Sequence, residues 1–218
     1  MKYFQSFPQI VTIDYVGNNI VLTNLMIRSE VIPGLLNNPL LFYSYDIQDG
    51  DTPEIIADKY YGDPYRYWIV LYANQLLDPQ WSWPMNQNLF QDYIIDKYTA
   101  ATANSLHISA NTVTPSQVMA YTQGTIQNYI KSVTTTDSYL QTPNTVIYII
   151  DSAAYANVPV NPVNISLDGA LVSRTTSKYT QSIYDYELQQ NEAKRNINLV
   201  NSIYVAQFEK QFKTLMSQ

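Results

Sequence analysis

Five carboxylates clustered near the start of the chain are the side chains best placed to do chemistry: Asp49, Asp51, Glu54, Asp58 and Asp63. A pair of Asp or Glu residues is the usual machinery of sugar hydrolysis. Three of the five, however, lie where they would cap a helix or face the positive end of its dipole, and no further Glu occurs between residues 55 and 186. We therefore predict that the chain is not an enzyme.

Other catalytic and metal-binding arrangements are equally poorly supported. The chain has no Cys and a single His, His107, which lies in a polar stretch without a surrounding motif, so we predict no cofactor and no metal. The run DIQDGD resembles a calcium loop only at first sight. Aligning Gly50 with the sixth position of an EF-hand puts Tyr45 and Ile56 at the first and twelfth ligand positions.

The carboxylates follow a predicted strand and lie in the loop after it, in a first helix and in the turn to a second helix. Residues 42–47 alternate as in a half-buried strand. Thr52 can cap a helix that has Pro53 at its first position, and Gly62 can end that helix in a left-handed conformation. A second helix follows, in which Trp68, Leu71 and Tyr72 form the face that we expect to pack against the first helix, and Trp68 is expected to be a core residue.

The stretch YSYDIQDGDTPEIIADKYYGDPYRYWIVLYAN, residues 43–74, resembles a LysM module. LysM modules of cell-wall proteins bind N-acetylglucosamine chains. The resemblance implies contact through the loop after the strand and stacking on a nearby aromatic ring, here Asp49, Gly50, Asp51, Thr52 and Trp81. The usual second strand, with its Pro-Gly turn, is missing, because the chain continues as LDPQWSWPM.

Composition narrows the range of partners. Charged residues make up 14% of the chain, the net charge is −6 and the pI is near 4.6, which argues against nucleic acid and anionic membranes. No apolar run approaches the roughly 20 residues of a membrane span, and the N-terminus has no secretory pattern. Tyr occurs 20 times. This abundance is typical of surfaces buried against another protein, and a general compositional habit explains it equally well.

The predicted fold class is α+β, in four parts. Residues 1–40 form a β-hairpin arm turning at residues 17–19, which could add to a neighbour's sheet, and residues 41–98 form the LysM-like domain. Residues 99–178 are a polar, β-rich or loop-rich insertion. It includes a buried strand at 145–150 and a hairpin at 163–172 that turns at Asp168-Gly169. Order or disorder of residues 99–142 stays open.

Residues 179–218 are predicted to form one long helix capped by Ser182. Apolar residues spaced by three or four form a continuous stripe: Ile197, Val200, Tyr204, Phe208, Phe212 and Leu215. A straight helix over 182–216 would be roughly 50 Å long, so part of the stripe is expected to pack on another chain. The alternative is a kink or a return onto its own domain.

The block YYGDPYRYWIVLYANQLLDPQWSW, residues 60–83, is similar to the LysM-containing baseplate wedge subunit of T-even-like contractile-tailed phages. The order of a short N-terminal region, a LysM core, a variable middle and a closing helix is similar too. The resemblance implies a structural subunit in the virion tail baseplate, assembled in the host cytoplasm, that joins neighbouring wedges around the hub. Implied partners are other wedge subunits and the sheath-initiating subunit.

Two sets of site residues follow. The interface candidates are Tyr65, Arg66, Tyr67, Trp81, Tyr204, Phe208 and Phe212, with Arg66 as a charge-assisted anchor and the two Phe residues as a contact for a partner helix. The alternative function is binding of peptidoglycan through the loop at residues 49–52 and Trp81.

Overall fold

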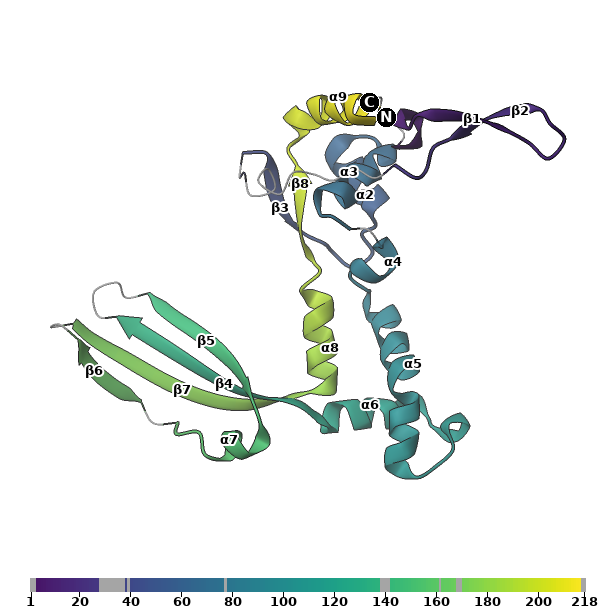
Figure 1. Cartoon of the computed structure of the whole chain (residues 1–218). Coiled ribbons are helices and arrows are strands. Elements are labelled where there is room, and N and C mark those ends of the chain that lie inside the picture. Colours follow the sequence, from purple (N-terminus) through teal and green to yellow (C-terminus); the bar gives the residue numbers. More distant parts are fainter. Residues whose placement is uncertain are drawn as a thin grey trace. The chain divides into compact units, whose positions relative to one another are not determined.

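The computed structural model describes residues 3–27, 38, 40–76, 78–137, 142–160, 162–167 and 170–216. It is a mixture of helices and antiparallel sheets, as expected for the α+β class (Figure 1). The chain divides into two compact units. Unit 1 comprises residues 1–86 and 192–218, and unit 2 comprises residues 87–191. Unit 2 is therefore an insertion in the sequence of unit 1, which the four predicted parts did not anticipate.

Unit 1 begins with the predicted hairpin. A short 3-10 helix, η1 (Tyr3–Ser6), precedes strands β1 (Gln9–Ile13) and β2 (Asn19–Thr23), which pair from Gln9↔Thr23 to Ile13↔Asn19. The connecting turn is held by Asp14, whose Oδ1 accepts hydrogen bonds from the backbone N–H groups of Val16 and Asn18 at 2.9 and 2.8 Å. The predicted hairpin is present over residues 9–23, and its turn spans residues 14–18 instead of 17–19.

The central part of unit 1 runs strand, helix, helix, strand. Strand β3 (Phe42–Asp46) leads to α2 (Pro53–Tyr61), then to η2 (Pro64–Arg66) and α3 (Tyr67–Ala73), and later to β8 (Asn196–Val200). The predicted caps are present: the Thr52 Oγ1 accepts from the Ile55 N–H at 3.3 Å, and Gly62 is left-handed with φ 65°. Strands β3 and β8 are antiparallel, from Phe42↔Val200 to Asp46↔Asn196.

The prediction of one continuous C-terminal helix is wrong. The segment forms α8 (Ile183–Glu192), strand β8, a 3-10 turn η4 (Ser202–Tyr204) and α9 (Val205–Met216). Ile197 and Leu199 are buried and alternate with exposed residues. This period of two is that of a strand, so the segment is a strand and not part of a helix. The Asn74 side chain secures the strand, accepting from the Asn198 N–H at 2.7 Å and donating to the Asn198 carbonyl at 2.8 Å.

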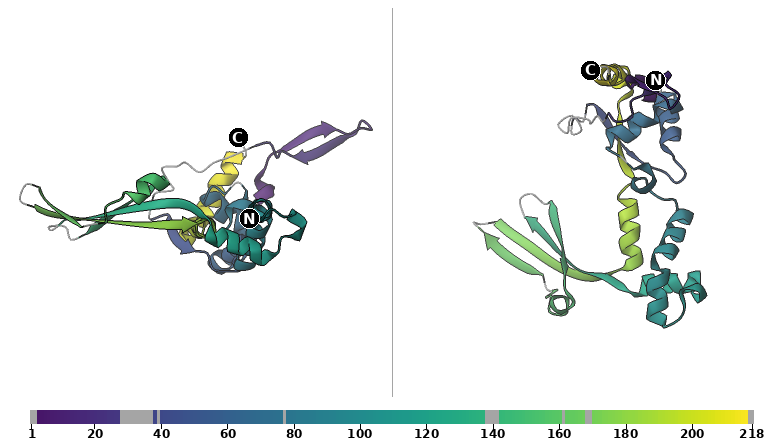
Figure 2. Two further views of the ribbon diagram at one scale, coloured as in Figure 1. Left: turned by 90° about the horizontal axis from the view of Figure 1, so that it is seen from below. Right: turned by 45° about the vertical axis from the view of Figure 1, so that its right-hand side comes forward.

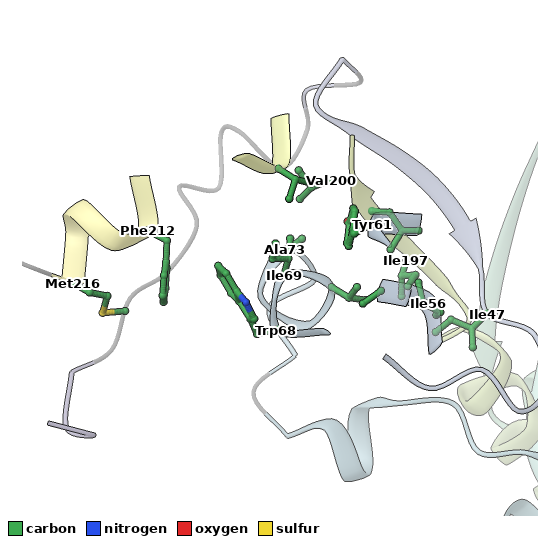
Figure 3. Close-up of a cluster of buried hydrophobic side chains, with 14 of the residues drawn as sticks. Ile47, Ile56, Tyr61, Trp68, Ile69, Ala73, Ile197, Val200, Phe212 and Met216 are labelled. Atoms are coloured by element: carbon green, nitrogen blue, oxygen red, sulfur yellow. The ribbon is translucent and has the colours of Figure 1, made fainter. Parts of the chain in front are cut away.

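Side chains of α2, α3, β8 and α9 form an apolar core (Figure 3). Trp68 is 3% exposed, which confirms it as a core residue. Its ring lies 4.6 Å from that of Phe212 and 6.0 Å from that of Phe208, while Tyr72 also contacts both Phe rings. The Trp68 and Tyr72 face of α3 therefore packs on α9, whereas we expected it to pack on α2. The short helix α4 (Pro79–Ser82) follows α3.

Unit 2 starts with helices where a β-rich or loop-rich stretch was expected. Helix α5 (Gln87–Leu106) continues well past residue 98 and is followed by η3 (Ala110–Thr112) and α6 (Pro115–Gly124). Buried hydroxyl groups are satisfied within these helices. Thr102 and Thr122 donate to the carbonyls of Tyr98 and Val118, four residues earlier, at 2.8 and 3.0 Å. Thr114 forms a capping box with Gln117 at the start of α6.

The rest of unit 2 is a four-stranded antiparallel sheet in the order β5-β4-β7-β6, seen from two further sides in Figure 2. Its strands are β4 (Ile126–Asp137), β5 (Pro143–Ile150), β6 (Val163–Leu167) and β7 (Ala170–Ser182), with helix α7 (Ser152–Ala156) between β5 and β6. The hairpin at 163–172 is confirmed, although its turn residues 168 and 169 lie outside the described residues. The strand at 145–150 is also present, but it is an exposed edge strand, so its predicted burial is wrong.

A buried carboxylate links α8 to α5. Glu187 is 8% exposed and accepts from Lys97 Nζ at 2.8 Å, from the Tyr98 hydroxyl at 2.6 Å and from the Tyr93 hydroxyl at 3.2 Å. Burial by itself raises the pKa of Glu187, but the hydrogen bonds from Lys97 and Tyr98 outweigh it and leave the pKa lowered. Burial and the bond to Glu187 raise the pKa of Tyr98 to about 12.

We expect Glu187→Gln to make the stability of unit 2 less dependent on pH. Because the folded pKa of Glu187 lies below its ordinary value of 4.5, its stabilisation is complete above that value and is lost as the pH falls through the folded pKa. At pH 7 the variant should lose about 2 kcal/mol of stability, the usual value of hydrogen bonds to a charged group, and the difference should shrink as the pH falls below 4.5 and through the folded pKa. Chemical unfolding of both proteins at pH 7 and pH 3 measures this. A difference that is independent of pH would contradict it.

Candidate functional site

An aromatic groove of about 580 Å³ lies on unit 1, where the N-terminal arm meets the turn between α2 and α3. The residues that line it come from η1, the two ends of the hairpin and the segment 65–67: Tyr3, Phe4, Gln5, Phe7, Gln9, Thr23, Tyr65 and Tyr67. None of the eight is charged. Five rings and three polar side chains in one concave surface are suited to hold an uncharged apolar segment of another protein.

The local sequence places each ring of the groove. Asp63 caps η2 by accepting from the Tyr65 N–H at 2.9 Å, and Pro64 occupies the first position of that turn. Tyr65 consequently points outward and is 55% exposed, as is Phe4. Tyr3 instead connects the groove to the core, with ring distances of 4.9 Å to Phe7 and 5.5 Å to Phe212. The groove therefore combines an exposed rim with a base that is fixed by the core.

The other interface candidates do not join this groove. Arg66 binds within the chain, donating from Nε to Glu209 Oε1 at 3.0 Å and from Nη1 to the Tyr61 carbonyl at 2.9 Å, so its anchoring of a partner stays a prediction. Trp81 on α4 is 59% exposed, and its carbonyl accepts from Lys194 Nζ at 2.7 Å. Tyr204 lies in η4 and is 36% exposed.

The helix contact proposed for Phe208 and Phe212 needs correction. Phe212 is 3% exposed and Phe208 is half-buried, and both pack on Trp68 and Tyr72 of the same chain. The stripe was assigned to another protein because a straight helix would have been too long for its own domain. Once the segment breaks at β8, α9 is short enough to cover its own core.

The polar groups of the loop that was expected to bind sugar form hydrogen bonds and ion pairs within the chain. Asp51 is 7% exposed, and its carboxylate accepts from Lys59 Nζ at 2.6 Å and from the Tyr45 hydroxyl at 2.7 Å. The indole N–H of Trp83 donates to the Asp51 carbonyl at 3.0 Å, and Asp49 pairs with Arg195 at 2.7 Å. Thr52 is the cap of α2, and Gly50 has φ 90° in the turn. The polar groups of this loop are therefore already used to fix β3, α2 and β8.

The same bonds shift the pKa of two groups. Burial alone raises the pKa of the Asp51 carboxyl, but the bonds from Lys59 and Tyr45 leave it lowered. The hydrogen bond to Asp51 raises the pKa of Tyr45 to about 12. Asp51 is thus an ionised acceptor at neutral pH, which suits a structural carboxylate rather than a general acid.

Neither metal sites nor membrane spans are found in the part of the chain that the structure describes. Within those ranges, no group of three His, Cys, Asp or Glu residues could hold a metal ion, and no helix is both long and apolar enough to cross a membrane. His107 is exposed just after α5, with a left-handed φ of 56°.

Sequence reasoning missed the N-terminal contribution to the groove. Tyr3, Phe4 and Phe7 have the spacing of one turn of helix, and that spacing was the available signal. It could not reveal that these rings lie against Tyr65 and Tyr67, which are far away in the sequence.

Residues 30–142, just over half of the chain, match the family of base plate wedge protein 53. The chain belongs to this family. It is 30% identical over 70 residues to the baseplate wedge protein gp53 of Enterobacteria phage T4, a match that covers 31% of this chain and 36% of that relative. The chain thus spans about a third of the length of the curated relative. Members of the base plate wedge protein 53 family are structural proteins of the phage tail baseplate, which is the role expected from the resemblance over residues 60–83.

Proposed function

We propose that this chain joins neighbouring wedges of the baseplate around the central hub, using protein–protein contacts of unit 1. The observation that carries the proposal is the uncharged aromatic groove on a chain of the wedge protein 53 family. Its partners would be other wedge subunits and the sheath-initiating subunit, met during assembly in the host cytoplasm. The exposed rings of Phe4 and Tyr65 would enter the partner as anchors, while Tyr3 and Phe7 hold the base of the groove.

A LysM-like module is the proposed framework for these contacts. Support comes from the order β3, α2, α3, β8 and from the antiparallel pairing of the two strands. The second strand that the local sequence lacks would be supplied by Asn196–Val200, after the inserted unit 2. In this proposal the chain has the strands and helices of the module, but the loop that would bind sugar is engaged in ion pairs within the chain. Asp49 is paired with Arg195, and Asp51 is paired with Lys59. Peptidoglycan binding is therefore not the function that we favour.

The test is co-expression of this chain with the tail proteins encoded beside it, followed by native mass spectrometry. We expect a hetero-complex of defined stoichiometry. Tyr65→Ala should weaken it by about 2 kcal/mol, roughly thirtyfold in Kd, which is typical of an interface anchor. Ile55→Ala is the matched control, because Ile55 is a 41% exposed apolar residue of the same unit outside the groove, and it should leave the complex intact.

Two results would count against the proposal. A wild-type chain that stays monomeric in the presence of its wedge neighbours would refute the joining role. A complex that loses as much affinity in Ile55→Ala as in Tyr65→Ala would place the contact elsewhere on unit 1. In either case, thermal unfolding of both variants checks that they are folded.

A further inference from the structure

Strand β5 forms one edge of the sheet in unit 2. It pairs with β4 along all eight of its residues, in unbroken register from Thr136↔Pro143 to Tyr129↔Ile150. Along its other side, no strand of the described residues lies beside it. Alternate backbone N–H and C=O groups on that side are therefore available for pairing, and such an edge can serve as a template for a further strand.

This edge lacks three of the features that usually protect one. Free edges are normally guarded by charged residues, bulges or an internal proline. The sequence PNTVIYII contains no charge, and its single proline occupies the first position. Four consecutive apolar residues are well exposed: Val146 at 41%, Ile147 at 57%, Tyr148 at 49% and Ile149 at 69%.

The charged residues of the sheet are confined to one face. Residues paired in register share a face, and successive residues alternate between faces. Lys131, Asp137, Arg174 and Lys178 consequently lie on the face that carries Tyr148. That face is partly covered by α7, since Tyr155 lies 5.1 Å from the Tyr129 ring and its carbonyl accepts from Lys178 Nζ at 2.9 Å.

The opposite face, which carries Ile147 and Ile149, has no charged residue on β4, β5 or on residues 173–179 of β7. Its members are Ile130, Ser132, Thr134, Thr136, Pro143, Thr145, Ile147, Ile149, Ser173, Thr175, Ser177 and Tyr179. The hydroxyls of Thr134 and Thr145 even bond to each other across the strands at 3.0 Å. A charged side chain buried against this face would find no partner of opposite charge, so the face selects an uncharged partner.

We propose that β5 receives an extended, uncharged strand of another baseplate protein, which becomes the fifth strand of the sheet. Backbone hydrogen bonds to the free side of β5 supply the pairing, and apolar side chains of the incoming strand cover Ile147 and Ile149. The inference rests on the proposed structural role in the baseplate, to which it adds a second contact, on unit 2.

Hydrogen exchange of the full-length chain tests this directly. The probe is the set of backbone amides of residues 144–149, compared between the purified chain and tails purified from phage that carry it. We expect their exchange to slow at least tenfold in tails. Equal exchange in both forms would overturn the inference while leaving the wedge role in place. A chain absent from purified tails would refute the wedge role and this inference together.

Variants in complemented phage give an independent measurement, namely the amount of the chain found in purified tails. Ile147→Lys with Ile149→Lys should lower incorporation at least tenfold, because two charges would be buried against the uncharged face. Ile147→Thr with Ile149→Thr keeps an uncharged β-branched strand and should incorporate normally. Val163→Lys, at a 51% exposed position of the opposite edge strand, is the control for added charge. Normal incorporation of the double Lys variant would count against the proposal.

Discussion

Removal of residues 196–218 is expected to unfold unit 1, although these residues were predicted to be part of one long helix over residues 179–218. They contribute six buried apolar side chains to the core: Ile197, Leu199, Val200, Val205, Phe212 and Met216. Each large buried side chain is worth about 2–5 kcal/mol, whereas a whole domain is stable by only about 5–15 kcal/mol. The truncated chain should therefore lose the near-ultraviolet signal of the packed Trp68 ring and its cooperative thermal transition.

A matched pair of point variants separates loss of packing from loss of chain length. Leu199→Ala, at a fully buried position of β8, should cost about 2–5 kcal/mol, whereas Ile203→Ala, at a 79% exposed position of η4, should stay within about 0.5 kcal/mol of wild type. Chemical unfolding measures both. If the truncated chain still unfolds cooperatively with a packed Trp68, then β8 and α9 are accessory and the βααβ order does not define the core.

Local signals in the sequence were sufficient wherever a structure depends on its nearest neighbours. The Thr52 cap and the left-handed Gly62 each depend on residues fewer than five positions away, and both are present. Such features need no knowledge of the rest of the fold.

The C-terminal segment could not be predicted in this way. Ile197 and Val200 lie three apart and so fit a helical stripe, but Ile197 and Leu199 also fit the alternation of a strand. The choice between them is made by β3, about 150 residues earlier in the chain, together with the side chain of Asn74. Pairing between strands so far apart in the sequence cannot be seen in a local pattern. The spacing of three or four was therefore wrongly interpreted as a helix.

The residues of the candidate site likewise divide into those that local sequence predicts and those that only the fold brings together. Tyr65 and Tyr67 were predicted as interface candidates from their place beside a turn, whereas the rings of η1 that complete the groove come from the other end of unit 1. Arg66 was predicted to be a charge-assisted anchor for a partner, and this stays a prediction. Its actual acceptor, Glu209, lies in α9, and only a fold that brings α9 back to η2 could reveal it.

Trp68→Ala is expected to destabilise unit 1 by about 3–5 kcal/mol, the usual cost of deleting a large aromatic ring from a core. The ring is 3% exposed and lies between Phe212 at 4.6 Å, Tyr3 at 5.6 Å and Phe208 at 6.0 Å, so no neighbour could fill the cavity without moving α9 or η1. Trp81→Ala is the matched control. Trp81 is 59% exposed, and the carbonyl that binds Lys194 remains in the variant, so its cost should be below about 0.5 kcal/mol.

The two substitutions should also differ in their effect on assembly. Because Tyr3 contacts both Trp68 and Phe212, loss of the Trp68 ring loosens the base of the aromatic groove, and stability and partner binding should fall together. Tyr65→Ala, at the rim, should reduce binding without a comparable loss of stability. Chemical unfolding and native mass spectrometry of the three variants distinguish these outcomes. Equal unfolding energies for Trp68→Ala and Trp81→Ala would mean that α9 does not pack on α3 as described, and the groove would then lack a fixed base.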